Sequence, residues 1–133
     1  MKRTKTSQQR FENLQREMAA ADRAADRIVA DRFHSFLMSD TKWCRVLNFL
    51  KEHKAIQQPF RWKFVDSESI FESRILCVAD RGFELFHGVA AFRHIERVGV
   101  VSPAAGEIQG ELAEQGLFDI EPIADGFKLY GYR

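Results

Sequence analysis

Histidines are the side chains best suited to acid–base or metal chemistry in this chain of 133 residues. Two of the four, His87 and His94, flank the segment Gly88–Phe92, which is predicted to turn between two strands, so their imidazoles could meet across a sheet. With Glu84 or Glu96 they would form the nitrogen and oxygen ligand set that suits zinc or iron. Their spacing matches no established ligand pattern, and the simpler interpretation is that they are hydrogen-bonded or solvent-facing strand residues. No metal site and no cofactor is therefore predicted.

The sequence also shows no motif that would activate a cysteine or a serine for catalysis. Cys44 and Cys77 form no C-x-x-C pair, and each lies among apolar neighbours in a predicted helix or strand, which is typical of a buried core thiol. A nucleophile needs a base and an orienting group, and neither a G-x-S-x-G nor a glycine-rich phosphate loop occurs. Carboxylates at strand ends, such as Asp66, could perform acid–base catalysis only in a cleft that no pattern indicates. We therefore predict no catalytic residue and no enzyme, with a hydrolase or metal enzyme at His87 and His94 as the open alternative.

The charge of the chain is balanced in total and uneven along its length. Lys and Arg number 20 and Asp and Glu number 19, which argues against a wholly basic nucleic-acid binder. Residues 1–81 hold 16 basic and 11 acidic residues, whereas residues 82–133 hold 4 basic and 8 acidic residues. This acidic back includes a predicted helix that carries Glu107, Glu111 and Glu114. It is either a solvated helix face or a docking surface for a basic partner.

One predicted strand, Phe60–Phe64, interleaves basic and aromatic residues as single-strand nucleic-acid binders do. Strand alternation places the aromatic side chains on one face and Arg61 and Lys63 on the other. The aromatic rings are then expected in the core and the cations in water, so nucleic-acid contact is not predicted from this strand.

A long helix from about residue 10 to 37 is predicted by an apolar seam with three- and four-residue steps. The seam consists of Phe11, Leu14, Met18, Ala21, Ala25 and Ile28. No Gly or Pro occurs before residue 59, and Arg and Asp recur at spacings that solvate a helix. Because Ala21 and Ala25 make the centre of the seam weak, the helix needs another surface. That surface is either its own domain, or a second copy or partner bound along helix 11–37.

A second helix, at about 41–54, follows directly. Ser39 and Asp40 offer an N-cap, and an apolar stripe with helical spacing comes after them. The stripe consists of Trp43, Val46, Leu47 and Leu50. These four side chains are predicted to be buried.

The remaining chain is dominated by short strands. Strands are expected at 60–64, 74–79, 83–87, 92–101, 119–124 and 127–132, and a third helix is expected at 102–116. The alternation of the fourth strand breaks near Arg97, which predicts a β-bulge there. The order predicts an α+β fold with a mainly antiparallel sheet of about six strands. Two parts are expected, namely a basic tail with a helical extension at 1–39 and a compact α+β domain at 40–133.

Four short segments stand in a recognisable order along residues 41–133. They are Thr41-Lys42-Trp43, Phe60-Arg61-Trp62-Lys63, the run from Phe83-Glu84-Leu85-Phe86 to His94-Ile95-Glu96-Arg97-Val98, and Phe127-Lys128-Leu129-Tyr130-Gly131-Tyr132. In this order they resemble a family of small uncharacterised bacterial proteins, a domain of unknown function. The long N-terminal helix departs from the family pattern. Such small α+β proteins are similar to immunity proteins of bacterial toxin systems, which bind a cognate toxin and block it.

The resemblance implies an immunity-type protein that neutralises a toxin without catalysis, by occluding its active site or substrate groove. Together with the acidic back, it assigns the partner contacts to Glu96, Glu107, Glu111 and Glu114, assisted by His94. The alternative is a regulatory or scaffold domain that forms a homodimer through helix 11–37. No apolar run approaches the ~18 residues of a membrane span, and the basic N-terminus lacks the apolar stretch of a secretion signal. We therefore expect a cytoplasmic location and no membrane partner.

Overall fold

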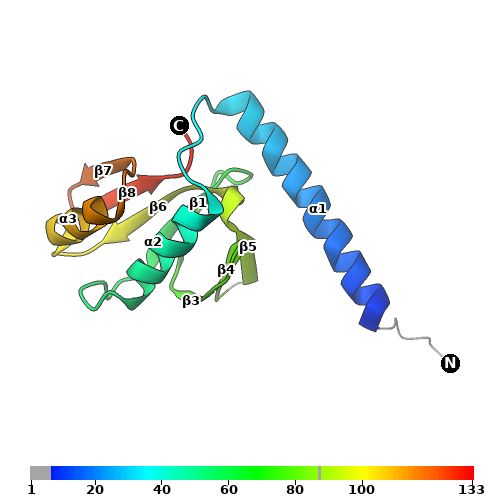
Figure 1. Cartoon of the computed structure of the whole chain (residues 1–133), viewed down its shortest axis with the longest axis horizontal. Coiled ribbons are helices and arrows are strands. Elements are labelled where there is room, and N and C mark those ends of the chain that lie inside the picture. The colour runs from blue at the N-terminus through cyan, green and yellow to red at the C-terminus, as the bar shows by residue number, and fades with distance from the viewer. Residues whose placement is uncertain (1–6, 87) are drawn as a thin grey trace.

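The computed structural model describes residues 7–86 and 88–133 (Figure 1). Most of the predicted basic tail, at residues 1–6, and the candidate ligand His87 lie outside this described part. The helices are α1 (Ser7–Arg32), α2 (Asp40–Glu52) and α3 (Ala105–Gln115), with a short 3-10 helix η1 (Phe92–His94). The strands are β1 (Phe60–Phe64), β2 (Ile70–Ser73), β3 (Ile75–Val78), β4 (Gly82–Leu85), β5 (Gly88–Ala91), β6 (Ile95–Val101), β7 (Ile120–Ile123) and β8 (Gly126–Tyr130).

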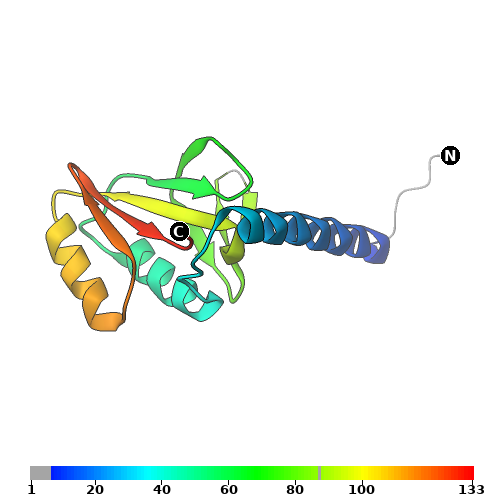
Figure 2. The same cartoon turned by 90° about the horizontal axis from the view of Figure 1, so that it is seen from above.

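Two antiparallel sheets carry the domain. The larger has the strand order β2-β1-β6-β8-β7, and the smaller has the order β3-β4-β5. In Figure 2, α2 and α3 lie along the same side of the larger sheet. The core between helices and sheet contains Trp43 and Leu47 of α2, Ile108 of α3, and Trp62 and Val98 of the sheet. The predicted α+β class with antiparallel strands is therefore confirmed.

The number of strands differs from the prediction, because β2 and β5 were not expected. Both strands have four residues and lie at the edge of a sheet, and neither alternates between buried and exposed side chains. Gly and Ala, which make up most of β5, are also depleted in strands, so no local pattern marks it. The described chain thus has eight strands in two sheets instead of about six in one. The predicted bulge is present, since the β1–β6 register shifts between Lys63 and Phe64, opposite Glu96.

Helix α2 has the cap and stripe that the sequence indicates. The Ser39 side chain accepts a hydrogen bond from the Lys42 backbone N–H at 3.2 Å. The apolar stripe is fully buried, with Trp43, Val46, Leu47 and Leu50 facing the sheet. The helix ends at Glu52, two residues before the expected end.

Helix α1 ends at Arg32 rather than at residue 37. The chain that follows bonds to the C-terminus instead, with the backbone N–H of His34 donating to the carbonyl of Arg133 at 2.8 Å. Phe36 forms an antiparallel bridge with Tyr132. These long-range hydrogen bonds replace the i to i−4 bonds of another helical turn, which a local pattern cannot anticipate.

Only part of α1 rests on the domain. Ala25 and Val29 are buried against Val65 in a small cluster separate from the main core. Figures 1 and 2 show the first half of the helix extending away from the two sheets. The second half of α1 therefore packs on its own domain, whereas the backbone of the first half runs away from that domain. No helix in the described residues is long and apolar enough to cross a membrane.

Tyr132 connects the end of α1 to the domain. Its phenol should make the free energy of unfolding of the domain sensitive to alkaline pH. The ring packs against Phe33, and its hydroxyl donates to the Arg93 carbonyl at 2.7 Å. Burial raises the pKa of this phenol above its ordinary value of 10.0. Below pH 10 the phenol is protonated in both the folded and the unfolded chain, and the stabilisation that Tyr132 gives the fold is complete. Above pH 10 the unfolded chain ionises first, so the free energy of unfolding falls as the pH rises through the folded pKa.

We expect Tyr132→Phe to flatten this alkaline decline. Urea denaturation of both chains at intervals between pH 8 and 12 measures it. Tyr130, whose pKa is also raised by burial, leaves a residual decline in the variant. Equal declines in the two chains would contradict the prediction.

Candidate functional site

The three glutamates predicted to bind a partner on α3 share one exposed helix surface. Glu107, Glu111 and Glu114 are exposed, whereas Ile108 and Leu112 are buried beneath them. Glu111 already has a partner, because its carboxylate lies 3.0 Å from Nε2 of His53, the C-cap residue of α2. The helix surface therefore offers two carboxylates that form no hydrogen bond or ion pair within the described part of the chain, Glu107 and Glu114.

His94 lies elsewhere and is occupied by α1. Its Nε2 is 2.9 Å from the Asp22 carboxylate, and the adjacent Arg93 reaches Asp22 at 3.5 Å and Asp26 at 3.7 Å. Because β6 lies between His94 and the start of α3, the structure places this residue at the opposite end of the strand from the three glutamates. His94 thus joins α1 to the domain.

Glu96 is buried rather than displayed. It is 7% exposed and forms ion pairs with Lys63 at 3.4 Å and with Arg97. Lys63, which was expected in water, is 6% exposed and also donates to the Phe64 carbonyl at 2.9 Å. The expectation for Lys63 was wrong because the bulge in β6 turns the Glu96 carboxylate toward it, and a buried ammonium is stable beside such a partner. Glu96 and the α3 glutamates do not form one surface.

Much of the acidic back is neutralised within the chain. Asp125 pairs with Arg61 at 3.3 Å, while Asp119 and Glu121 share Arg133 at 3.0 and 3.8 Å. Arg133 is itself one of the four basic residues of the back, whereas Arg61 belongs to the basic front, residues 1–81. Pairs such as Arg61–Asp125 and Lys63–Glu96 therefore make the charge of residues 82–133 alone overstate the charge that this surface presents. The acidic back is weaker as a docking surface than its composition indicates.

A groove lies between the β1–β2 hairpin and the β4–β5 hairpin, where no site was predicted. We call it the β2–β5 groove, with a volume of about 320 Å³. It is lined by Phe64, Asp66, Ser67, Phe71, Ser73, Leu85, Gly88, Val89 and Ala90. One lining residue is acidic and none is basic.

Exposed apolar side chains gather around this groove. Phe71 is 41% exposed and Val89 is 76% exposed, and the neighbouring Phe86 is 64% exposed. The Phe71 ring continues a row of aromatic rings from the core, since its centroid lies 6.0 Å from that of Phe64. Single exposed apolar residues are common on protein surfaces, but a group around a concavity marks a binding surface.

Two hydrogen bonds to Ser73, which lines the groove, hold β2 against its neighbours. The Trp62 indole donates to the Ser73 carbonyl at 3.1 Å, and the Phe86 backbone N–H donates to the Ser73 hydroxyl at 3.2 Å. Ser73 therefore ties β2 to the end of β4. No sequence pattern revealed the groove, because its walls are the two strands that sequence periodicity missed.

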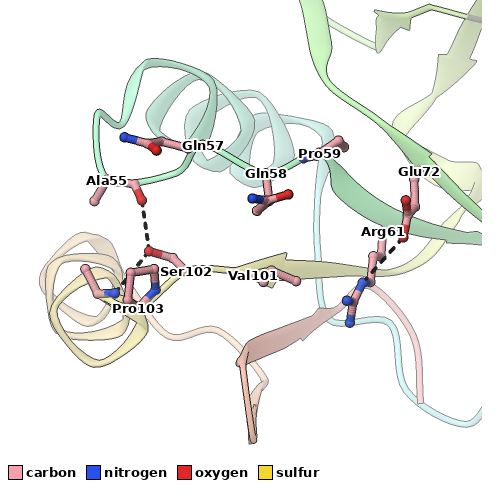
Figure 3. Close-up of a pocket in the computed structure, with 10 residues that line it drawn as sticks. Ala55, Gln57, Gln58, Pro59, Arg61, Glu72, Val101, Ser102 and Pro103 are labelled. Atoms are coloured by element: carbon pink, nitrogen blue, oxygen red, sulfur yellow. Dashed lines mark hydrogen bonds and ion pairs between the residues drawn. The ribbon is translucent and has the colours of Figure 1, made fainter.

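A second concavity, of about 490 Å³, lies at the other end of β1 (Figure 3). Figure 3 shows the Ser102 hydroxyl bonded to the Ala55 carbonyl on one side and Arg61 beside Glu72 on the other. Arg61 is shared between Glu72 at 3.8 Å and Asp125 at 3.3 Å. Its guanidinium is thus engaged by the chain itself, so this basin is a weaker candidate than the β2–β5 groove.

His87 lies outside the described residues, and the other residues first considered for chemistry do not form a metal cluster. Within residues 7–86 and 88–133, no three His, Cys, Asp or Glu side chains lie close enough to hold a metal ion. Both cysteines are free; Cys44 is half-buried and Cys77 is exposed. The expectation of two buried thiols was wrong for Cys77, because the β3–β4 register shifts between Ile75 and Cys77, so that Ile75 and Val78 pack against the core and Cys77 does not.

Comparison with known proteins adds no relative to this picture. No family model, no curated protein and no solved structure matches the chain.

Proposed function

We propose that the chain is an immunity-type protein of the cytoplasm that binds a cognate bacterial toxin and neutralises it without catalysis. The observation that supports this is the β2–β5 groove with its exposed Phe71 and Val89. Protein interfaces centre on apolar and aromatic side chains that bury surface on binding, with polar groups at the rim. The groove combines these features on a rigid support of two sheets.

The charge around the groove favours a basic partner. Asp66 lines the groove, and Glu84 lies directly opposite Val89 in the β4–β5 pairing. Both carboxylates are exposed, and neither has an ion pair in the described part of the chain. A toxin segment with Lys or Arg beside apolar residues would satisfy both features. Glu107 and Glu114 of α3 are a second, separate acidic surface for the same partner.

Aspartate among the apolar side chains of the groove should weaken toxin binding. We expect Phe71→Asp to weaken the complex about a hundredfold or more, because it places a charge in an apolar contact. Co-expression with the product of the neighbouring upstream gene, where the proposal expects a toxin domain, followed by titration calorimetry of the purified pair, measures the loss.

Leu117→Asp is the matched control for this substitution. Leu117 is 90% exposed just after α3, away from the groove, so this variant should bind as the original chain does. Equal binding by Phe71→Asp and Leu117→Asp would place the interface elsewhere. Failure of the original chain to protect cells against the product of the neighbouring upstream gene would overturn the proposed function.

A second candidate is a regulatory or scaffold domain that dimerises through α1. It is favoured by the extension of the first half of α1 beyond the domain (Figure 2). Light scattering of the full chain distinguishes the two proposals, with a mass of twice 15.4 kDa expected for the dimer. Leu14→Glu, within the sequence seam, should then restore the monomer, and a monomeric original chain would dismiss this candidate.

A further inference from the structure

We infer that the groove takes an extended segment of its partner, which pairs with the free edge of β5 as an added strand. This inference rests on the proposed function and specifies how the partner is held. It depends on the backbone of β5 and on the chemistry of the groove, which are independent features.

The backbone of β5 presents unpaired hydrogen-bonding groups at its outer edge. β5 is the edge strand of the smaller sheet, and its pairing with β4 places Phe83 opposite Ala90 and Glu84 opposite Val89. The same register continues to Arg81 and Phe92, where the Phe92 N–H donates to the Arg81 carbonyl at 3.0 Å. Hydrogen-bonded and non-hydrogen-bonded pairs alternate along an antiparallel ladder.

Counting from that hydrogen bond, Ala90 faces β4 with its N–H and C=O, whereas Val89 and Ala91 direct theirs away from it. The Ala91 carbonyl begins the 3-10 helix η1 as its N-cap, so at Ala91 only the N–H remains for a partner. No backbone hydrogen bond from Val89 to another part of the described chain replaces its contacts. An outward donor and acceptor at Val89, with a second outward donor two residues on at Ala91, form a pattern to which another strand binds.

β5 is short, but its edge lacks the residues with which proteins block strand addition. Lysine, proline and inward-pointing charges are the common protections, and none occurs in Gly88–Ala91. Instead, β5 carries the exposed Val89 beside an apolar groove. This edge is therefore open to pairing.

The groove selects the side chains of the added strand. Alternate residues of an added strand point to opposite faces, so one set would enter the groove between Phe64, Phe71 and Leu85, which accept apolar side chains. The other set would lie beside Glu84 and Val89 on the outer face of β4 and β5, where a carboxylate favours Lys or Arg. The occupant is thus an extended segment in which apolar and basic residues alternate.

Amide exchange with a synthetic peptide tests strand pairing directly. The probe is acetyl-Lys-Val-Lys-Val-Lys-Val-amide, and the control is the same peptide N-methylated at its two central residues. We expect the probe to slow exchange of the Val89 and Ala91 amides about tenfold or more, with Ala90 as the internal reference because its amide already faces β4. The N-methylated peptide should bind about tenfold more weakly, since each lost backbone hydrogen bond removes about 1 kcal/mol.

Equal binding of the two peptides, absence of binding at millimolar probe, or unchanged exchange at Val89 would each overturn strand pairing. Val89→Pro removes the outward N–H at an edge position that tolerates proline, and Val89→Thr keeps it. The proline variant should lose the probe and the threonine variant should retain it, with circular dichroism confirming that both fold.

The two proposals fail in different ways. A Val89→Pro chain that loses the probe and still protects cells from the toxin would overturn strand pairing and leave the proposed function standing. An original chain that binds the probe and protects against no toxin would overturn the proposed function alone.

Discussion

Replacing Glu96 with alanine is expected to lower the free energy of unfolding by about 3 kcal/mol or more, because it leaves the Lys63 ammonium buried without its carboxylate. Lys63 and Glu96 are 6% and 7% exposed, so little water reaches either group. The ammonium keeps the Phe64 carbonyl as an acceptor, but a single neutral acceptor does not balance a buried charge. Urea denaturation followed by the fluorescence of the buried Trp43 and Trp62 measures the loss.

Two further variants separate the buried pair from its surroundings. Arg97→Ala removes a partner that is more exposed than Lys63 and should cost about 1 kcal/mol or less. Combining Lys63→Met with Glu96→Leu removes both charges and should recover most of the stability lost in Glu96→Ala. A Glu96→Ala chain of unchanged stability that no longer binds the proposed toxin partner would instead make Glu96 a partner contact, as the family resemblance implies.

Gly126→Ala is expected to destabilise the domain by about 3 kcal/mol, because no space exists for a methyl group at the start of β8. A Cβ built on Gly126 would lie 1.7 Å from the Val100 carbonyl oxygen, and that oxygen belongs to the backbone of the central strand β6. The clash can be relieved only by moving β8 away from β6, which disturbs the pairing of Gly126 with Val101. The midpoint of urea denaturation reports the effect.

Gly110→Ala is the matched control for this substitution. Gly110 lies within α3, and an added Cβ meets nothing within 4 Å. Alanine should stabilise the helix by about 0.5 to 1 kcal/mol, since it restricts the unfolded chain and favours helix. The two variants therefore move stability in opposite directions, and equal shifts of the same sign would contradict the argument.

Local periodicity accounts for the elements that were predicted well. The stripe of α2 recurs at helical spacing and is buried as expected, and the hairpin of β7 and β8 is present, with its turn at Ala124 and Asp125. The β6 bulge was also visible, as a break in strand alternation near Arg97. In each case the signal lies within a few neighbouring residues.

The candidate site could not be predicted in this way. Its walls, β2 and β5, are four-residue edge strands with small or exposed side chains, and they become strands only because β1 and β4 provide hydrogen-bonding partners. The end of α1 at Arg32 has the same kind of cause, since the C-terminus competes for the backbone of residues 34–37. A local pattern cannot predict a hydrogen-bonding partner that comes from a distant part of the chain.

The charged residues show most plainly which features depend on local sequence and which depend on tertiary structure. Residue types and spacing alone predict the α+β class and the buried stripes, because burial on a helix or strand repeats with the geometry of the backbone. Residue types alone also show that the chain has a basic front and an acidic back. Which charges face solvent depended on tertiary structure, since the pairs Lys63–Glu96 and Arg61–Asp125 join residues that only folding brings within 3.4 Å. Folding therefore neutralised much of the acidic back and placed the strongest candidate surface at the β2–β5 groove.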